Sequence, residues 1–169
     1  MFSALSKNGC NIGLVLSTVT ETSIAEMQTV GILAEDLGFK SIYVNEGKGD
    51  ALACVQSIAS ATEKITVGTN IANIHYRQPY LTAATSKLVA EISQGRFVLG
   101  LGISHAGLLK TLGISMGDGR IKLGAHAKLV ADVLNGESIN GLLKPKPSKY
   151  KIPIYLAGNT VESASLAGK

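Results

Sequence analysis

The strongest constraint on the fold of this chain is a regular alternation of short apolar runs with longer amphipathic segments. Five of the runs have the length and composition of strands: residues 11–17, 41–45, 65–72, 97–103 and 152–157. Each is too short for a helix and suits a strand that is buried on both faces. Strands and helices that alternate along a chain with short connections predict an α/β fold, with a parallel sheet covered by helices.

The segments between the strands carry start and stop signals for helices. Ser23 and Glu26 have the spacing of a capping box. The other expected helix starts are Asp50, Pro79, Arg120 and Thr160, and the expected stops are Gly38, Gly95 and Gly136. One strand and one helix together take about 33 residues, which suits either a barrel of βα units or an open doubly wound sheet.

Composition and charge exclude several classes of protein. The chain has 169 residues, a net charge of +4 and 5% aromatic residues, unlike the concentrated basic surface of a nucleic-acid-binding protein. It contains no run of about 18 uncharged apolar residues, so no membrane-spanning helix is expected. Cys10 and Cys54 belong to no CxxC or Cys/His cluster. This favours two buried thiols and a cytoplasmic location over a disulfide framework or a metal site.

Polar side chains gather where the predicted strands end. In parallel α/β proteins, functional sites form at the carboxyl ends of the strands. The residues that follow the second to fifth predicted strands are Asn45 and Glu46; Asn70, Asn73, His75, Tyr76 and Arg77; Ser104 and His105; and Gly158, Asn159 and Thr160. These residues are the candidates for binding and catalysis.

The most reactive candidates each allow two interpretations. Glu46 follows an apolar strand and suits either a general base or ligand acceptor, or a solvated carboxylate at the rim. His105 suits an acid, a base or a ring-stacking group, or a rim histidine with no chemical role. Residues 158–160 precede a helix and form either a phosphate site or a simple N-cap. His126 falls within the fourth predicted helix and is expected on the surface.

Gly100 and Gly102 resemble the start of a dinucleotide-binding fingerprint, but that interpretation fails. The third glycine of the GxGxxG pattern is replaced by His105, and no helix is predicted to begin directly there. Glycines inside a strand also let another backbone or a flat ligand approach closely, and we expect that role here.

Several segments resemble the bacterial-luciferase-like superfamily, which comprises flavin-dependent monooxygenases and oxidoreductases that depend on the deazaflavin coenzyme F420. The matching segments are LGFKSIYVNE (37–46), VGTNI (67–71), YRQP (76–79), ISQGRFVLGLG (92–102), Ser104-His105 and PIYLA (153–157). The last two are similar above all to F420-dependent members such as methylenetetrahydromethanopterin reductase. Coenzyme F420 is therefore favoured as the cofactor, with FMN as the alternative.

The resemblance implies a (βα)8 TIM barrel, which typically needs about 250 residues when closed. About five βα units account for nearly all of this chain. We therefore expect residues 1–169 to form one luciferase-like domain, a partial barrel that is incomplete at its carboxyl terminus. An open five-stranded sheet leaves two parallel edges, which favour a homo-oligomer or a partner chain that covers them. An open flavodoxin-like domain fits the number of strands but not the motifs.

The resemblance also implies roles for individual residues. It places a non-proline cis peptide bond, rare in proteins, between Asn70 and Ile71, where it would back the cofactor ring. It implies that Glu46 and His105 are catalytic residues near the ring. The implied cofactor-binding residues are Asn45, Asn70, Ile71, Ser104, Gly158, Asn159 and Thr160, with the phosphate in the loop at 158–160. No metal ligand is expected.

The implied chemistry is hydride transfer or monooxygenation of a small organic substrate by an oxidoreductase that uses F420 or FMN. Two departures from the family weigh against it. The histidine that usually follows the acidic residue is Gly47 here, and the expected barrel lacks its last three βα units. A non-catalytic half-barrel that acts as a binding or assembly protein is therefore the alternative hypothesis.

Overall fold

The computed structural model describes residues 11–19, 22–158 and 160–168, so the predictions for Cys10 and Asn159 lie outside the described residues. The strands are β1 (Gly13–Ser17), β2 (Ser41–Asn45), β3 (Thr66–Thr69), β4 (Ala72–Asn73), β5 (Phe97–Gly102) and β6 (Ile154–Leu156). The helices are α2 (Ile24–Asp36), α3 (Ala51–Ala61), α4 (Pro79–Ile92), α5 (Ala106–Thr111), α6 (Gly119–Asn135) and α7 (Val161–Ala167).

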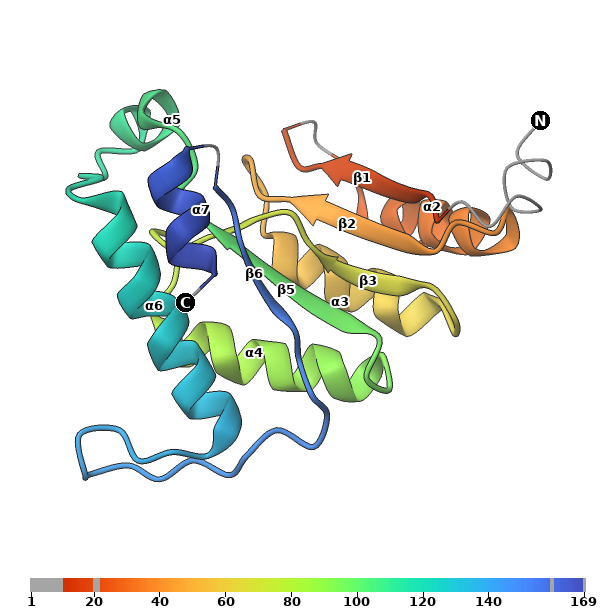
Figure 1. Cartoon of the computed structure of the whole chain (residues 1–169). Helices are drawn as coiled ribbons and strands as arrows, with labels where there is room; N and C mark the ends of the chain where they lie inside the picture. The colour runs from red at the N-terminus through yellow and green to blue at the C-terminus, as the bar shows by residue number, and fades with distance from the viewer. Residues whose placement is uncertain (1–10, 20–21, 159, 169) are drawn as a thin grey trace.

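All strand pairs in the sheet are parallel, as the alternation predicts. The order of the strands is β1-β2-β3-β5. Strand β4 pairs with the last residues of β5, further along that strand than β3 does, and β6 also pairs with β5. In Figure 1, α2, α3 and α4 lie on one side of the sheet, whereas none of the described helices crosses the other side of β1, β2 and β3. The arrangement is a partial (βα) barrel, which confirms the predicted fold class.

The predicted caps form where the sequence places them. Glu26 donates its backbone N–H to the hydroxyl of Ser23 at 3.2 Å, and its carboxylate accepts the backbone N–H of Ser23 at 2.7 Å. Asp50 caps α3 by accepting the N–H of Ala53 at 2.9 Å. Gly136 ends α6 with a φ of 77°, in the left-handed region that glycine adopts without strain. Local signals therefore determine these helix ends.

The structure differs from the predicted elements in two places. The predicted strand 65–72 is divided into β3 and β4, because the chain turns at Asn70–Ile71, where the peptide bond is cis. The cis bond lies where the resemblance implies it. The short helix α5, after Ser104, has no counterpart in the sequence prediction because six residues carry too little periodicity to detect.

The glycines of β5 allow two strands to approach closely. A Cβ atom added to Gly100 would lie 2.2 Å from the carbonyl oxygen of Thr69. The hydroxyl of Thr69 also bonds to the backbone of Gly100, because it donates to the carbonyl of Gly100 at 2.8 Å and accepts its N–H at 3.0 Å. This confirms the expected close backbone approach at Gly100, whereas a Cβ atom at Gly102 would meet the side chain of Ile71 at 2.7 Å.

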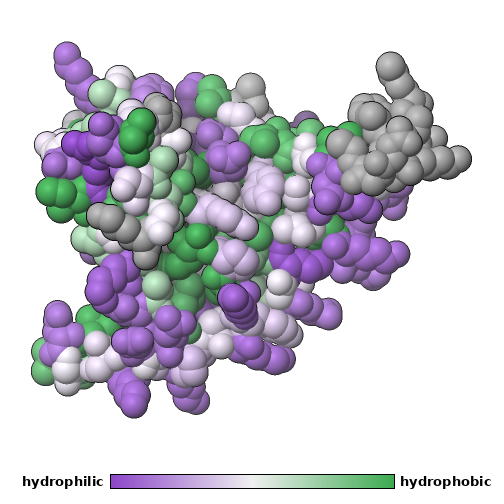
Figure 2. All heavy atoms as spheres, in the orientation of Figure 1, coloured by the Kyte–Doolittle hydropathy of each residue, from purple (hydrophilic) through white to green (hydrophobic). Residues whose placement is uncertain are grey.

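The two faces of the sheet differ in burial. On the face toward the helices, Ile42, Val67 and Phe97 are paired across β2, β3 and β5 and are fully buried. On the other face, the paired row is Val15, Tyr43, Gly68 and Val98. Gly68 is buried, Tyr43 and Val98 are half-buried, and Val15 is 53% exposed. Figure 2 shows apolar and weakly polar residues gathered at the centre of this open face.

The expectation for His126 was wrong. His126 is only 6% exposed, and its Nε2 lies 3.3 Å from the hydroxyl of Thr82 on α4. Helix α6 packs along α4, so a position that looks exposed from the pattern of α6 alone is covered by its neighbour. Cys54 is a buried free thiol, as expected. Among the described residues, no helix combines the length and apolar character needed to cross a bilayer.

Candidate functional site

A cavity of about 530 Å³ lies at the carboxyl ends of the strands. Its lining comes from Ile71 in the turn between β3 and β4; Gly102 at the end of β5, with Ile103 and Ser104 after it; Ala157 and Gly158 after β6; Arg120 and Leu123 of α6; and Thr160, Glu162 and Ser163 at the start of α7. The predicted site residues Ile71, Ser104, Gly158 and Thr160 therefore meet in one place. Asn70 lines a smaller neighbouring cavity on the open face, with Tyr43 and Tyr155.

The end of β2 holds the turn that contains the cis bond. The side-chain amide of Asn45 donates to the carbonyl of Asn70 at 3.0 Å, and the backbone N–H of Glu46 donates to the carbonyl of Ile71 at 3.1 Å. The N–H of Asn70 donates to the carbonyl of Val44 at 2.8 Å. These bonds satisfy both carbonyl groups of the turn and direct the side chain of Ile71 into the cavity wall.

Glu46 lies inside the protein and not at the rim. It is 3% exposed, which contradicts the solvated-carboxylate interpretation. Its carboxylate accepts hydrogen bonds from the N–H of Asn73 at 2.5 Å, the N–H of Ala51 at 3.1 Å and the guanidinium of Arg77 at 2.7 Å. Both oxygens are thus occupied by partners that hold β4 and the start of α3. Glu46 is not among the residues that line the cavity.

Arg77 links this carboxylate to a second one. One nitrogen of its guanidinium bonds Glu46 and the other contacts Asp50. Burial by itself would lower the pKa of Arg77, but the hydrogen bond and charge of Glu46, together with Asp50, raise it above its usual value. The Arg77 charge is therefore held by these two carboxylates.

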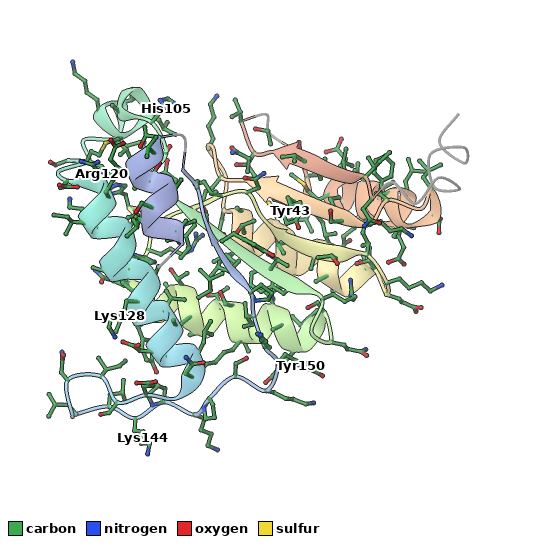
Figure 3. All side chains as sticks on the ribbon, viewed as in Figure 1. Tyr43, His105, Arg120, Lys128, Lys144 and Tyr150 are labelled. Carbon is green, nitrogen blue, oxygen red and sulfur yellow. The ribbon has the colours of Figure 1, made fainter. Side chains whose placement is uncertain are left out.

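Ser104 and His105 follow β5 but differ in position. Ser104 lines the cavity and has a φ of 61°, an uncommon value outside glycine. His105 is exposed and caps α5, where its Nδ1 accepts the N–H of Leu108 at 3.2 Å. Figure 3 shows His105 at the same end of the molecule as Arg120. His105 therefore stands at the rim, outside the residues that line the cavity.

The start of α7 forms the N-cap that was one of its two interpretations. Thr160 and Ser163 make a capping box, in which the Thr160 hydroxyl accepts the N–H of Ser163 at 3.2 Å. A Cβ atom added to Gly158 would lie 2.9 Å from the hydroxyl oxygen of Ser163, so the loop passes close to the helix. The predicted phosphate role of this loop is tested by no observation in the structure.

Arg120 and Glu162 were missed as site residues. Arg120 lies in the first turn of α6 and brings a cation to the cavity wall, and Glu162 brings a carboxylate from α7. The available signal was the N-cap: Asp118 accepts the N–H groups of Arg120 and Ile121, which places Arg120 at the carboxyl edge of the sheet.

Gly47, where the family pattern has histidine, has a steric explanation. A Cβ atom at this position would lie 2.7 Å from Cγ2 of Val19 and 3.1 Å from its backbone nitrogen. The N–H of Gly47 donates to the hydroxyl of Thr18 at 2.7 Å, which holds the segment after β1 against this loop. A larger residue at position 47 requires this segment to move.

The chain belongs to the luciferase-like monooxygenase family, whose sequence model matches residues 12–169. It is 26% identical over 147 residues to the 5,10-methylenetetrahydromethanopterin reductase of Methanolobus tindarius. The alignment covers 81% of this chain and 45% of the relative. It is 23% identical over 168 residues to the F420-dependent glucose-6-phosphate dehydrogenase of Microbacterium testaceum, covering 85% of this chain and 50% of the relative.

Solved structures share the fold. The coenzyme F420-dependent tetrahydromethanopterin reductase of Methanopyrus kandleri superposes with a TM-score of 0.77 at 19% identity, over 94% of this chain and 53% of that protein. The chain thus spans about half the length of the relatives it matches.

Among the described residues, no group of three or more His, Cys, Asp or Glu side chains is placed to hold a metal ion.

Proposed function

We propose that this chain carries the cofactor-binding part of a luciferase-like oxidoreductase and binds coenzyme F420, or FMN in its place, in the cavity at the carboxyl strand ends. The single observation that carries the proposal is the composition of this cavity, which combines an apolar floor with polar groups at its edge. The relatives named as reductases and dehydrogenases of the F420 type favour F420.

The residues present fit such a group. Ile71, Ile103 and Leu123 offer an apolar surface for a flat ring, and a volume of about 530 Å³ is in the usual range for small-ligand sites. The side chain of Ile71 packs closely against the backbone of Gly102, because a Cβ atom at Gly102 would lie 2.7 Å from Cγ1 of Ile71. Arg120 supplies the cation that a phosphate group on the cofactor needs.

The bound cofactor would accept or donate the hydride, or activate oxygen for monooxygenation, and the protein would orient it and exclude water. In this proposal Ile71 backs the ring, and Asn45 holds the turn that presents Ile71. Ser104 and residues 158–160 bind the polar parts of the cofactor. His105 stands at the rim, where it can exchange a proton with a small organic substrate. Glu46 positions β4 through its backbone bonds, because its oxygens are already occupied.

The proposal is tested by titrating the purified chain with F420 and with FMN and following cofactor fluorescence. We expect saturable binding of F420 and weaker binding of FMN. Replacing Arg120 by glutamine removes a charge-assisted bond worth about 1.5–3 kcal/mol, so the dissociation constant should rise roughly 10- to 100-fold. The matched control is Lys128→Gln, on the same helix but paired with Asp132 at the surface. A folded chain that binds neither cofactor contradicts the proposal.

The alternative function, a non-catalytic half-barrel that assembles with another chain, is favoured by the open face of the sheet. Tyr155 on β6 is 63% exposed and Val15 on β1 is 53% exposed, although both lie on strands. Exposed apolar residues on a sheet favour association. Sedimentation of the purified chain distinguishes the two candidates: a tight complex with no cofactor binding supports assembly, whereas cofactor binding by the monomer supports the oxidoreductase.

A further inference from the structure

A second cavity, of about 660 Å³, lies between the loop before α4 and helix α6. The loop contributes residues 74–79, and α6 contributes Lys122, Ala125, His126 and Leu129. None of these residues lines the cavity at the strand ends. We call it the histidine cavity, because two of the three histidines of the chain, His75 and His126, line it.

Two side chains of the histidine cavity carry buried polar atoms without partners. Nε2 of His75 and the hydroxyl of Tyr76 are inaccessible to solvent and make no hydrogen bond to any described residue. Buried polar atoms in folded proteins nearly always have a partner, and an exception calls for an explanation. Because both atoms lie behind the cavity wall, a molecule in the cavity that accepts hydrogen bonds would supply the missing partners once the two half-buried rings turn toward it.

The charges around the cavity favour an anion. Among the described residues, none of the side chains that line it is acidic. The charge of Arg77 is held by Glu46 and Asp50, so Lys122 is the lining cation whose charge is not taken up by a carboxylate in the described part of the chain. Its ammonium donates to the carbonyl of Ser115 at 3.2 Å, which leaves further N–H donors for a ligand.

The lowered pKa values of His75 and His126 favour neutral rings. Burial lowers the pKa of His75, and the charge of Lys122 lowers it further. Burial also lowers the pKa of His126 to about 4, with a further contribution from His75. Neutral imidazoles still carry one N–H donor each, and an anion that enters the cavity would favour their protonated forms.

We infer that the histidine cavity binds a small organic anion, with an oxyanion head such as a phosphate or carboxylate group and an apolar body. Lys122 would contact the head, and His75 and Tyr76 would do so once their rings turn the unpartnered atoms into the cavity. Ile74, Ala125 and Leu129 supply apolar surface for the body, and the volume is in the range of small-ligand sites. This site is separate from the proposed cofactor cavity and does not depend on it.

The test uses the histidine signals in the proton NMR spectrum of the whole chain, with phenyl phosphate as the probe. His75→Gln and His105→Gln assign two of the three ring signals, and the signal of His126 follows by elimination. We expect phenyl phosphate to shift the signals of His75 and His126 in a saturable way and to leave that of His105 unchanged. Inorganic phosphate should bind more weakly because it lacks the body, and benzyl alcohol should cause no shift.

Two lysine variants on the same helix separate a specific site from general charge attraction. In Lys122→Gln the dissociation constant for phenyl phosphate should rise about tenfold, because a charge-assisted bond is lost. In Lys128→Gln, whose lysine is paired with Asp132 away from the cavity, it should not change. Absence of a saturable shift, a shift of His105 alone, or equal effects of the two variants would each overturn the inference.

Discussion

The two sides of the sheet differ in how far they bury side chains of the same kind. On the side covered by helices, apolar side chains such as Phe97 and Ile42 are fully buried, and charged groups are paired inside the protein. On the open side, the row that begins with Val15 remains partly exposed, and Tyr155 lies with most of its surface accessible. The buried apolar contacts that stabilise the fold therefore lie mainly on the covered side, whereas the open side leaves apolar surface available for contact with another molecule.

Polar groups on the covered side are held by several partners at once. Arg96 donates to the carbonyls of Ala59, Thr62 and Ile65, and so ties the end of α3 to β5. The carboxylate of Glu35 on α2 accepts the N–H groups of residues 63–65. Such satisfied groups are costly to disturb, because a lost partner leaves a buried charge or donor behind.

The largest effect is expected from breaking the buried ion pair between Glu46 and Arg77. Arg77→Leu leaves the Glu46 carboxylate buried without its cation, and we expect the free energy of unfolding to fall by about 3–5 kcal/mol. Urea denaturation measures it. The double variant Glu46→Leu with Arg77→Leu should recover part of the loss, because the carboxylate that remains unpaired, Asp50, is half exposed to water. A loss below about 1 kcal/mol in the single variant would show that water reaches this carboxylate.

The next effect is a loss of stability in acid through His126. Its pKa is about 4 in the folded chain, because burial and, to a smaller extent, His75 disfavour the charged ring. The unfolded chain takes up this proton first, so the stabilisation is complete above about pH 6.5 and is lost as the pH falls toward 4. Between pH 7 and pH 5 the contribution should fall by about 2 kcal/mol.

Urea denaturation at several pH values checks the prediction for His126. In His126→Gln, the stability should change less over the same range, and the difference between the two curves isolates the histidine from the carboxylates. The NMR titration of the His126 ring signal provides a second readout. A midpoint near 6.5 would contradict the burial of this side chain.

A smaller effect comes from the same substitution made once on each side of the sheet. Val44→Ala removes two buried methyl groups beneath the helices, and we expect a loss of about 2 kcal/mol. Val15→Ala removes the same atoms from the open side and should cost less than about 0.5 kcal/mol. Both are read from urea denaturation. Equal losses would mean that the open side is covered in solution, for example by a second copy of the chain.

Much of the fold follows from local patterns. The capping box at Ser23, the Asp50 cap and the stop at Gly136 form as predicted, because each depends on a few neighbouring atoms. The parallel order follows from the alternation of strands and helices. The division of β3 and β4 was not visible in the pattern of apolar residues, and only the resemblance placed a cis bond there.

The candidate site was less predictable. Ile71 and Ser104 lie on the cavity wall, but Glu46 and His105 are not among its lining residues, and Arg120 was missed. The position of a residue after a predicted strand indicates the edge of the sheet at which it lies. The position does not indicate whether the side chain is buried beside a partner, as Glu46 is beside Arg77, or points to solvent. That choice depends on residues up to 31 positions away in sequence.

The amino-acid sequence was enough to predict the α/β class, the parallel direction of the strands, most helix ends and the family, because these depend on short-range periodicity, capping and contiguous motifs. The folded structure was needed to find which polar residues are buried, how α6 covers His126 and which side chains share a cavity. The physical reason is that burial and pairing depend on contacts between distant segments, and a side chain buried beside a partner has the same local pattern as one that faces water.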